Sequence, residues 1–261
     1  MDTLNPVIFC GAGPGDPDLI TVKGQRALAA ADLVVYAGSL VPEALLKWTR
    51  PHCRHLSSAG LHLEEMVSAM ADAWDTGKKV VRLHTGDPSL YGAIFEQMAK
   101  LRERNVPYSV IPGITAAFAA AAALGVEYTL PEVSQTLILT RMAGRTPVPE
   151  TESLTSLATH RATMAIYLSI SMVDEMTRIL SDAYGSDGAC AVVYRASQPD
   201  QKILWTTTGQ LADTVRKEKI TRTALVVVGR VLDVSLDTLV HNSKLYDRHF
   251  AHGYRNAEDE R

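Results

Sequence analysis

The sequence has little of what would place it in several large classes of protein. It contains 3 cysteines in 261 residues and carries a net charge of −3. Cys10, Cys53 and Cys190 form no Cys-x-x-Cys pair, so we expect free thiols in a cytoplasmic protein rather than disulfides. The lack of a basic excess argues against a nucleic-acid partner, because domains that bind nucleic acid usually have an isoelectric point above about 9.

Long apolar runs and metal-binding patterns are also lacking. The longest uncharged apolar stretch spans residues 114–126, whereas a transmembrane helix needs about 20 residues. We therefore expect a buried helix there and no membrane partner. The first residues lack the basic segment of a signal peptide, which also favours the cytoplasm. The histidines and cysteines show no zinc-binding spacing such as His-Glu-x-x-His, so we expect no metal site.

What is present is the composition and the pattern of a globular α/β protein. Hydrophobic residues make up 46% of the chain and charged residues 21%, which is typical of a globular domain. In the first half, short β-branched runs alternate with helical patterns, which predicts βαβ units and a mainly parallel sheet. The expected strands there are residues 7–10, 33–36, 80–83 and 108–111, and the expected helices are residues 20–31, 43–49, 62–76 and 89–105.

The second half has more strand than helix, which predicts a mixed sheet. Its expected strands are residues 134–141, 164–169, 191–195, 203–207 and 224–231, and its expected helices are residues 152–160, 172–184 and 209–218. The Ala-rich helix ends near Gly125 and Pro131 follows, so we place a domain boundary there. The expected organisation is an N-terminal domain of residues 1–126, a C-terminal domain of residues 127–233 and a flexible tail of residues 234–261.

The first candidate site is the string at residues 11–17 (GAGPGDP), between an expected strand and an expected helix. A dinucleotide-binding turn needs Gly-x-Gly-x-x-Gly. Here Asp16 occupies the third glycine position and Pro14 removes a backbone N–H. A tight turn explains the glycines, because glycine adopts positive φ freely. Glycines without a Cβ also let other groups approach the backbone closely.

Four further strings are candidates: the first two follow expected strands, the third joins two expected strands, and the fourth is read as a central strand. They are residues 84–92 (HTGDPSLYG), 112–117 (PGITAA), 194–201 (YRASQPDQ) and 222–229 (RTALVVVG). Ligands of open α/β sheets bind at the carboxyl ends of strands. Asp87 before Pro88 also predicts a helix N-cap followed by a first-turn proline. Taken singly, each string has a purely structural interpretation, as a capped helix, a packed Ala helix, a hairpin loop or a buried central strand.

Together and in this order, these strings resemble those of the tetrapyrrole methyltransferase family. The resemblance runs from residue 6 to about residue 233 and rests on GAGPGDPDLITVKG, VVRLHTGDPSLYG, VIPGITAAFAAAAALG, YRASQPDQKILWTT and TALVVVGRV. Residues 36–43 (YAGSLVPE) and the string LPEVSQTLILTRMAGRTPVPE are similar to the subgroup that methylates carbon 11 of precorrin-4 in cobalamin (vitamin B12) biosynthesis. The family implies two αβα domains with S-adenosylmethionine in a cleft between them, S-adenosylhomocysteine as product, and a homodimer.

Position by position, the resemblance implies cofactor contacts made mostly by backbone and by small residues. The implied cofactor-binding residues are Pro14, Thr85, Gly86, Asp87, Leu90, Tyr91, Thr115, Ala116, Tyr167, Leu168, Arg195, Ala196, Thr223 and Ala224. Thr85 replaces the first glycine of the family's Gly-Gly-Asp triplet, and Leu168 stands where many relatives have Met. For Asp87 we expect placement of the loop or of the cofactor amine rather than proton transfer.

One departure from the family pattern concerns acid/base chemistry. Relatives that methylate uroporphyrinogen carry an Asp and a Lys, proposed as an acid/base pair, where this chain has Ala37 and Ser58. That pair therefore cannot be transferred, uroporphyrinogen activity is not expected, and no catalytic residue is assigned. The implied substrate carries carboxylates, which arginine binds in bidentate geometry. The candidate substrate contacts are Arg141, Arg195, Lys23 and Arg145.

Three alternatives to the carbon-11 methyltransferase stay open at this point. One is a sister methyltransferase that acts at another position of the corrin ring. Another is a nicotinamide-dependent oxidoreductase on the same α/β pattern, which Pro14 and Asp16 disfavour. The third is a non-catalytic module that binds a cofactor or a partner. The sequence also leaves open whether the substrate contains cobalt.

Overall fold

The computed structural model describes residues 5–38, 40–235, 237 and 243–257. Contacts within the chain divide it into two compact units: Met1–Ala119 with Arg195–Gln201, and Ala120–Tyr194 with Lys202–Arg261. The segment Arg195–Gln201 thus belongs by its contacts to the first unit. The domain boundaries expected from the sequence remain predictions.

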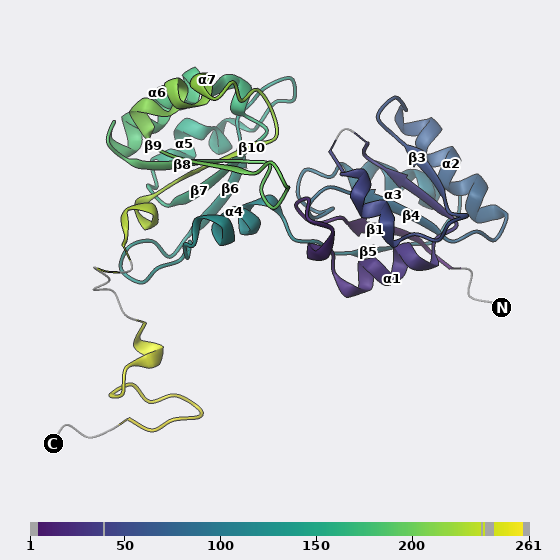
Figure 1. Cartoon of the computed structure of the whole chain (residues 1–261), viewed down its shortest axis with the longest axis horizontal. Helices are drawn as coiled ribbons and strands as arrows, with labels where there is room; N and C mark the ends of the chain where they lie inside the picture. The colour runs from purple at the N-terminus through teal and green to yellow at the C-terminus, as the bar shows by residue number, and fades with distance from the viewer. Residues whose placement is uncertain (1–4, 39, 236, 238–242, 258–261) are drawn as a thin grey trace. The chain divides into compact units, whose positions relative to one another are not determined.

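The first unit is built on a five-stranded sheet with the strand order β3-β2-β4-β1-β5, in which every pairing is parallel (Figure 1). The strands are β1 (Val7–Gly11), β2 (Leu33–Tyr36), β3 (Arg54–Ser57), β4 (Val80–His84) and β5 (Tyr108–Ile111). Because parallel strands point the same way, their carboxyl ends lie at one edge of the sheet, and the loops that follow them lie close together.

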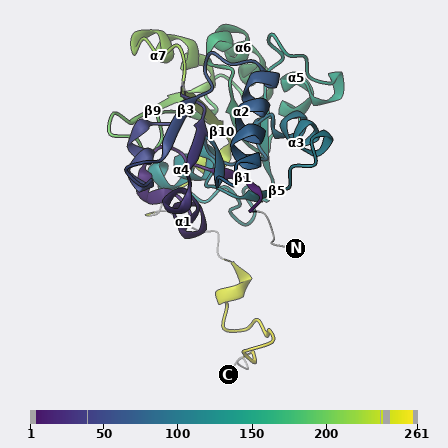
Figure 2. The same cartoon turned by 90° about the vertical axis from the view of Figure 1, so that its right-hand side faces the viewer.

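Helices cover both faces of this sheet. They are α1 (Val22–Ala30), α2 (Leu63–Asp75) and α3 (Ile94–Glu103). Leu28 of α1 packs in the same core cluster as Cys10, Val34 and Leu83, while α2 and α3 pack against residues of the other face, including Phe9 and Val35. Figure 2 shows α1 on one side of the strands and α2 and α3 on the other. Side chains alternate between faces along a strand, so β1, β2 and β4 contribute to both clusters.

Two helices expected in this unit differ from the structure. The helix expected over residues 89–105 begins only at Ile94, because the Asp87 side chain accepts from the backbone N–H of Ser89 and closes a turn that continues to Leu90. Asp87 therefore caps that turn and not a helix. The segment Glu43–Trp48 is a 3₁₀ helix, η2, rather than an α-helix. Ser39, in the string that precedes it, lies outside the described residues.

The second unit contains a mixed five-stranded sheet with the order β6-β7-β10-β8-β9. Only the β6–β7 pair is parallel, and the pairs β7–β10, β10–β8 and β8–β9 are antiparallel. The helix α4 (Ala116–Leu124) begins in the first unit and ends in the second, because the division falls after Ala119. The other elements of the second unit are β6 (Leu137–Arg141), α5 (Leu154–Ala158), β7 (Thr163–Tyr167), α6 (Val173–Tyr184), β8 (Ala189–Tyr194), β9 (Lys202–Thr207), α7 (Leu211–Lys217) and β10 (Ala224–Val228). The α/β fold with a parallel first sheet and a mixed second sheet is thus confirmed.

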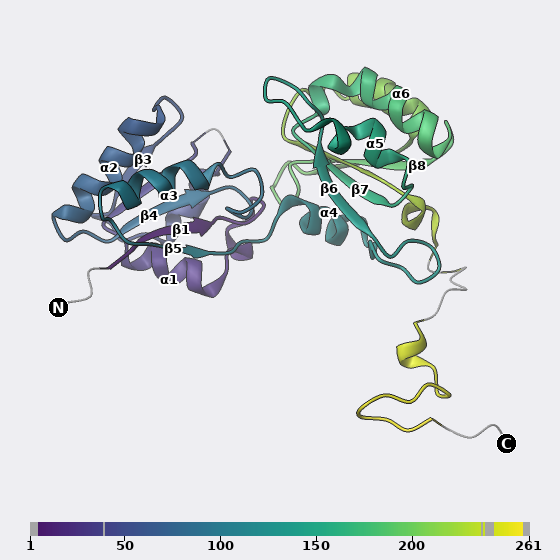
Figure 3. The ribbon, with the colours of Figure 1, turned by 180° about the vertical axis from the view of Figure 1, so that it is seen from behind.

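A core cluster lies between the second sheet and helices α5, α6 and α7. It includes Met176 and Leu180 of α6, Leu211 of α7, and Met164 and Val226 of the sheet, all at most 1% exposed. Figure 3 shows α6 and α4 on opposite faces of these strands. The strand Ala224–Val228 lies in the middle of the sheet, as its β-branched run predicts.

After β10 the described residues form short local structure. A 3₁₀ turn, η8 (Lys244–Tyr246), is followed by Arg255, whose Nη2 donates to the carbonyl of Leu245 at 2.8 Å. Part of the expected tail lies outside the described residues. No helix in the described part of the chain is long and apolar enough to cross a membrane.

Candidate active site

The loops that follow β1, β4 and β5 lock together at the carboxyl edge of the first sheet. Gly13 and Gly86 exchange backbone hydrogen bonds, with N···O distances of 3.2 and 2.8 Å. The N–H of Ala12 donates to the carbonyl of His84 at 2.7 Å. The first two candidate strings are therefore joined by their backbones, although more than 70 residues separate them.

The glycines of these loops let the chain approach itself. A Cβ added to Gly11 would lie 2.6 Å from the Cα of Gly113, and one added to Gly113 would lie 2.2 Å from the carbonyl oxygen of Gly86. Gly13 has φ of +77°, and a Cβ there would lie 3.0 Å from the carbonyl oxygen of Leu19. What approaches these glycines closely is thus the protein's own backbone, and both the turn and the loop packing require glycine.

Asp87 connects two of these loops through its carboxylate. Its Oδ2 accepts from the backbone N–H of Gly113 at 2.8 Å, and its Oδ1 accepts from the N–H of Ser89 at 2.8 Å and from the hydroxyl of Ser89. Burial raises the pKa of Asp87, but the hydrogen bonds from Ser89 and Gly113 outweigh burial and the net shift is downward. Asp87 is therefore ionised at neutral pH and holds the loops that follow β4 and β5 in register.

Two buried polar side chains precede this loop on β4. Arg82 and His84 are 5% and 4% exposed. Burial, with a smaller effect of the Arg82 charge, lowers the pKa of His84 to about 3, so its imidazole is neutral at pH 7. Its ring stacks on Phe9 with the ring centroids 5.9 Å apart, and its Nε2 has no hydrogen-bond partner among the described residues. This pair is not among the residues expected from the sequence, although polar residues at alternate positions of the apolar run VVRLH are a detectable signal.

The segment Arg195–Gln201 brings a fourth string to the first unit. The Ser197 hydroxyl accepts from the backbone N–H of Asp16 at 3.0 Å, and Gln198 Nε2 donates to the carbonyl of Pro14 at 3.5 Å. A Cβ on Gly15 would lie 2.3 Å from Gln198 Cγ. Arg195 forms an ion pair with Asp200. The predicted site residues Arg195 and Ala196 therefore belong to the same unit as Pro14.

The remaining candidates of the first unit lie in the same loops. Pro14, Gly86 and Thr115 are buried, Leu90 and Ala116 are half-buried, and Thr85 and Tyr91 are exposed. Ala116 is the first residue of α4. The structure thus brings the first-unit candidates to the loop edge of one parallel sheet.

The candidates of the second unit share one edge of the mixed sheet. Arg141, at the end of β6, lies opposite Tyr167, at the end of β7, and Leu168 follows. Ala224, at the start of the antiparallel strand β10, lies opposite Tyr194, at the end of β8. The sheet therefore brings Arg141, Tyr167, Leu168, Thr223 and Ala224 to the same end of the second unit.

Backbone strain marks several of these positions independently of any motif. Ten non-glycine residues of the described chain have positive φ, and four of them are candidates: Tyr91, Leu168, Arg195 and Thr223. Two more lie next to or near a candidate: Ser197 follows Ala196, and Ala93 lies two residues after Tyr91. Such conformations cost free energy and are concentrated at functional sites. This observation supports the candidate set without reference to relatives.

Thr223 offers a test of this strain. A β-branched residue at φ of 55° is unfavourable, so we expect Thr223→Gly to raise the free energy of unfolding by about 0.5–1 kcal/mol. If the strained conformation serves a ligand, affinity for S-adenosylhomocysteine falls at the same time. The control is Lys219→Gly, at φ of 54° outside the candidate set, which should gain stability without losing affinity. Urea unfolding and calorimetric titration measure the two quantities. Equal affinities for both variants would contradict a functional role for the strain.

The four cations predicted to contact substrate differ in their surroundings. Arg141 donates to the carbonyls of Thr146 and Pro147 at 3.0 and 2.9 Å and so holds its own loop. Arg195 is bound to Asp200. Lys23 and Arg145 are exposed, and neither takes part in an ion pair with another described residue.

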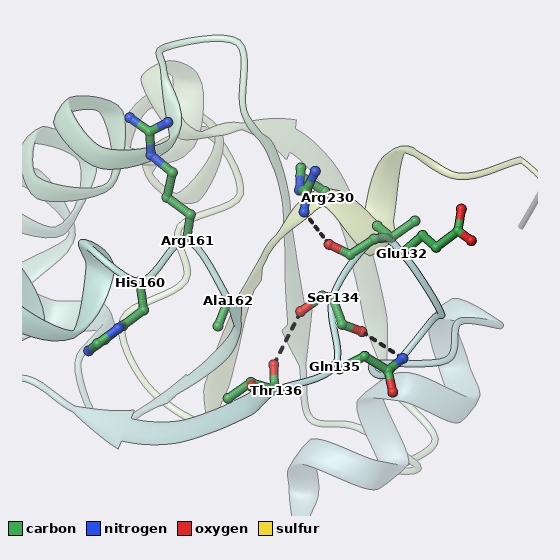
Figure 4. A pocket seen from close by; sticks show the side chains of 9 residues that line it. Glu132, Ser134, Gln135, Thr136, His160, Arg161, Ala162 and Arg230 are labelled. Atoms are coloured by element: carbon green, nitrogen blue, oxygen red, sulfur yellow. Dashed lines mark hydrogen bonds between the residues drawn. The ribbon is translucent and has the colours of Figure 1, made fainter.

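A depression of about 330 Å³ lies at the other end of the second sheet, beside the start of β6 and β7 and next to Arg230. Figure 4 shows the side chains of Glu132, His160 and Arg161 pointing in different directions. Arg230 donates to the carbonyl of Val133. The charged groups do not converge there, so this depression is not the candidate active site. Within the described residues, no group of three or more His, Cys, Asp or Glu side chains is placed to hold a metal ion.

Comparison with known proteins identifies relatives over nearly the whole chain. The family model for tetrapyrrole (corrin/porphyrin) methylases matches residues 6–212. A cobalt-precorrin-4 C(11)-methyltransferase of Methanocaldococcus jannaschii is 49% identical over 98% of this chain and 98% of its own length. A precorrin-4 C(11)-methyltransferase of Pseudomonas aeruginosa is 50% identical over 97% of this chain and 99% of its own length.

Solved structures agree with these relatives. A cobalamin biosynthetic enzyme, the cobalt precorrin-4 methyltransferase CbiF, is 48% identical, with a TM-score of 0.85 over 88% of this chain and 96% of that one. A uroporphyrin-III C-methyl transferase from Thermus thermophilus in complex with S-adenosylhomocysteine is 25% identical, with a TM-score of 0.72 over 87% of this chain and 93% of that one. The family resemblance inferred from the sequence is confirmed: the chain belongs to the tetrapyrrole (corrin/porphyrin) methylases.

Proposed function

We propose that this chain transfers a methyl group from S-adenosylmethionine to carbon 11 of precorrin-4 or cobalt-precorrin-4 in cobalamin biosynthesis. The observation that carries the proposal is the match, at about half identity over almost the whole chain, to relatives named for this reaction. The family match over residues 6–212 includes the loops that meet at the carboxyl edge of the first sheet.

The chemistry of the candidate residues fits a sulfonium cofactor. Methyl transfer removes the positive charge of the sulfonium, so a free anion beside it would stabilise the ground state more than the transition state. Asp87 directs both of its carboxylate oxygens to donors of the protein, Ser89 and Gly113. Next to it lies Gly86, where an added Cβ would lie 3.6 Å from the Cα of Thr115, so small residues and backbone groups meet there. These groups can bind the cofactor without placing an uncompensated anion at the sulfur.

We therefore propose that the candidate residues of each unit are cofactor-binding residues. In the first unit these are Pro14, Thr85, Gly86, Asp87, Leu90, Tyr91, Thr115, Ala116, Arg195 and Ala196, and in the second unit Tyr167, Leu168, Thr223 and Ala224. The cofactor supplies an already activated methyl group. The protein's contribution is to orient the two reactants, and such alignment can lower a barrier by about 7–11 kcal/mol. Asp87 contributes by fixing the loops that carry the contacts.

We propose that no single ionisable side chain is essential for the chemical step. Ala37 and Ser58 replace the acid/base residues proposed for relatives that methylate uroporphyrinogen. His84, next to the candidate loop, is buried and has a pKa of about 3, so at pH 7 it is a weak base. A kcat that falls by several orders of magnitude on replacing one ionisable site residue, with unchanged KM, would contradict this proposal.

The substrate's carboxylates are the proposed targets of the cations at these edges. Lys23 and Arg145 are exposed and available to a ligand. Arg141 and Arg195 already hold loop groups, so their proposed contact with substrate requires the remaining N–H groups of each guanidinium. A KM for the tetrapyrrole that rises on Lys23→Met or Arg145→Met, with an unchanged KM for the cofactor, would support these contacts.

The deciding experiment is mass spectrometry of the tetrapyrrole product. Purified protein is incubated with S-adenosylmethionine and with precorrin-4 made enzymatically, with and without cobalt. We expect a gain of one methyl group, placed at carbon 11 by NMR, and the cobalt comparison identifies the physiological substrate. A methyl at another ring carbon would favour a sister methyltransferase. No methyl gain, with S-adenosylhomocysteine still bound, would overturn the substrate but keep the cofactor. The homodimer and the cytoplasmic location expected from the sequence remain predictions.

A further inference from the structure

Arg82 is a buried cation in the middle of the first sheet. It lies on β4 between Val81 and Leu83, and only 5% of its surface is exposed. Burial lowers its pKa to about 10, so it stays protonated at pH 7. None of the ion pairs formed by the described residues includes it. A buried charge without a counter-ion is costly, so its retention at this position calls for a specific contribution.

The guanidinium is held by hydrogen bonds to three groups. Nε donates to Gln97 Oε1 at 3.1 Å, and Nη1 donates to the carbonyls of Val35 at 3.3 Å and Leu83 at 3.5 Å. Gln97, on α3, is itself 3% exposed. Its Nε2 donates to the carbonyl of Ala93 at 2.8 Å. A continuous series of hydrogen bonds therefore runs from the centre of β4 through Arg82 and Gln97 to Ala93.

The donor–acceptor direction of this series of hydrogen bonds is fixed by its two ends. Arginine can only donate, so it must face the amide oxygen of Gln97, and the Ala93 carbonyl can only accept, so it must face the amide nitrogen. Gln97 is thus the adaptor between a donor and an acceptor, and neither an apolar residue nor a carboxylate provides both functions.

This series of hydrogen bonds ends at Ala93, where the backbone is strained. Ala93, at the start of α3, has φ of 48°, and Tyr91 has φ of 56°. Both lie in the loop Thr85–Ala93, which also carries Gly86, Asp87 and Leu90 of the candidate set. One end of this loop is held by Asp87. At the other end, the carbonyl of Ala93 accepts from Gln97, which gives the loop a second attachment next to the strained residues.

We propose that Arg82 and Gln97 are positioning residues that hold the loop Thr85–Ala93 in the strained conformation that binds S-adenosylhomocysteine. The inference rests on the proposed function, because it assumes that this loop contacts the cofactor. Neither residue touches the cofactor in this proposal; both act through the Ala93 carbonyl.

The test is a double-mutant cycle with Arg82→Met and Gln97→Met. Replacing a buried charge by an apolar residue of similar volume is often neutral or stabilising for a fold, so a merely structural role would leave ligand affinity unchanged. We expect each single variant and the double variant to bind S-adenosylhomocysteine about tenfold more weakly by calorimetry. The affinity of the double variant should be no lower than that of the weaker-binding single variant, because both residues act through the same series of hydrogen bonds. KM for the cofactor rises while kcat changes little.

Two measurements keep the proposal falsifiable. The double variant removes both polar groups and leaves no unpaired Arg82 or Gln97, so it covers the case in which a single variant does not fold. Hydrogen exchange of the amides in residues 85–93 should be faster in the variants than in the wild type without any ligand. The matched control is Tyr184→Phe, which removes a bond from a buried hydroxyl to the carbonyl of Ala162 in the second unit and should leave affinity and loop exchange unchanged.

A folded double variant with wild-type affinity and wild-type exchange would overturn the positioning role. A wild type that binds no S-adenosylhomocysteine would instead overturn the proposed function. The exchange measurement would still decide whether Arg82 and Gln97 hold the loop.

Discussion

Replacing Gly113 with alanine is expected to destabilise the first unit and to slow methyl transfer by about 100-fold. The new Cβ would lie 2.2 Å from the carbonyl oxygen of Gly86 and 2.8 Å from the Cα of Gly11, and backbone atoms cannot rotate out of the way as a side chain can. Overpacking of this kind costs about 3 kcal/mol. A displacement of about 1 Å in the loops that align the reactants reduces a rate by about 100-fold. Urea unfolding and the methyl-transfer assay measure both effects.

The matched control for Gly113→Ala is Gly60→Ala. Gly60 has no other heavy atom within 4 Å of the position that its Cβ would take, and its φ is not positive. The same chemical change there should leave stability and activity close to those of the wild type. A fully active Gly113→Ala variant would show that the loops after β1, β4 and β5 can separate without loss of function, and would contradict the role given to their packing.

Asp87→Asn is expected to lower both the stability of the protein and its affinity for S-adenosylhomocysteine, with the second-largest effect after Gly113→Ala. The amide retains one oxygen, so its nitrogen must face either the N–H of Gly113 or the N–H of Ser89, and one of the bonds at 2.8 Å is lost. Hydrogen bonds to a charged acceptor contribute about 1.5–3 kcal/mol, so we expect a loss of about 2 kcal/mol in stability. Affinity for S-adenosylhomocysteine should fall by about tenfold or more, because the loop loses its attachment to Gly113.

The pH dependence of this variant follows from the direction of the pKa shift. The pKa of Asp87 is lowered in the folded state, so its stabilisation is present above the unfolded pKa of about 3.9 and is lost as pH falls through the folded pKa. The stability difference between the wild type and Asp87→Asn should thus be largest near neutral pH and shrink below about pH 4. Asp18→Asn, whose side chain is 74% exposed beside Lys47, should change stability by at most about 0.5 kcal/mol at any pH. A pH-independent effect of Asp87→Asn would contradict the role of the ionised carboxylate.

The sequence predicts those parts of the fold that depend on local pattern. The strands Leu33–Tyr36 and Tyr108–Ile111 have the expected bounds, because short β-branched or aromatic runs between turn signals specify a strand locally. The helix after Pro88 was predicted to begin too early. Asp87 and Pro88 form a strong helix-start signal, but here the Asp87 carboxylate also binds Gly113, which lies 26 residues further along the chain.

Contacts between distant segments account for what the sequence did not predict at the site. Gly11 and Gly113 must both be glycine because their backbones are in close contact. The hydrogen bond between Arg82 and Gln97 joins a strand to a helix 15 residues further along the sequence. Neither pair has a spacing that local pattern detects. The two arginines proposed for substrate also have partners that the sequence does not predict. Arg195 pairs with Asp200, and Arg141 donates to three backbone carbonyls.

The attachment of Ser197 to Asp16 has a consequence for the order in which the protein is completed. The first unit includes Arg195–Gln201, and the bond between Asp16 and Ser197 joins residues 181 positions apart. During synthesis, the N-terminal part of a chain emerges and folds first. The turn at Pro14–Asp16 must then wait until about three-quarters of the chain has been made before its last contacts can form. An N-terminal fragment that ends before residue 195 would contain every strand of the first sheet and still lack part of its glycine loop's support.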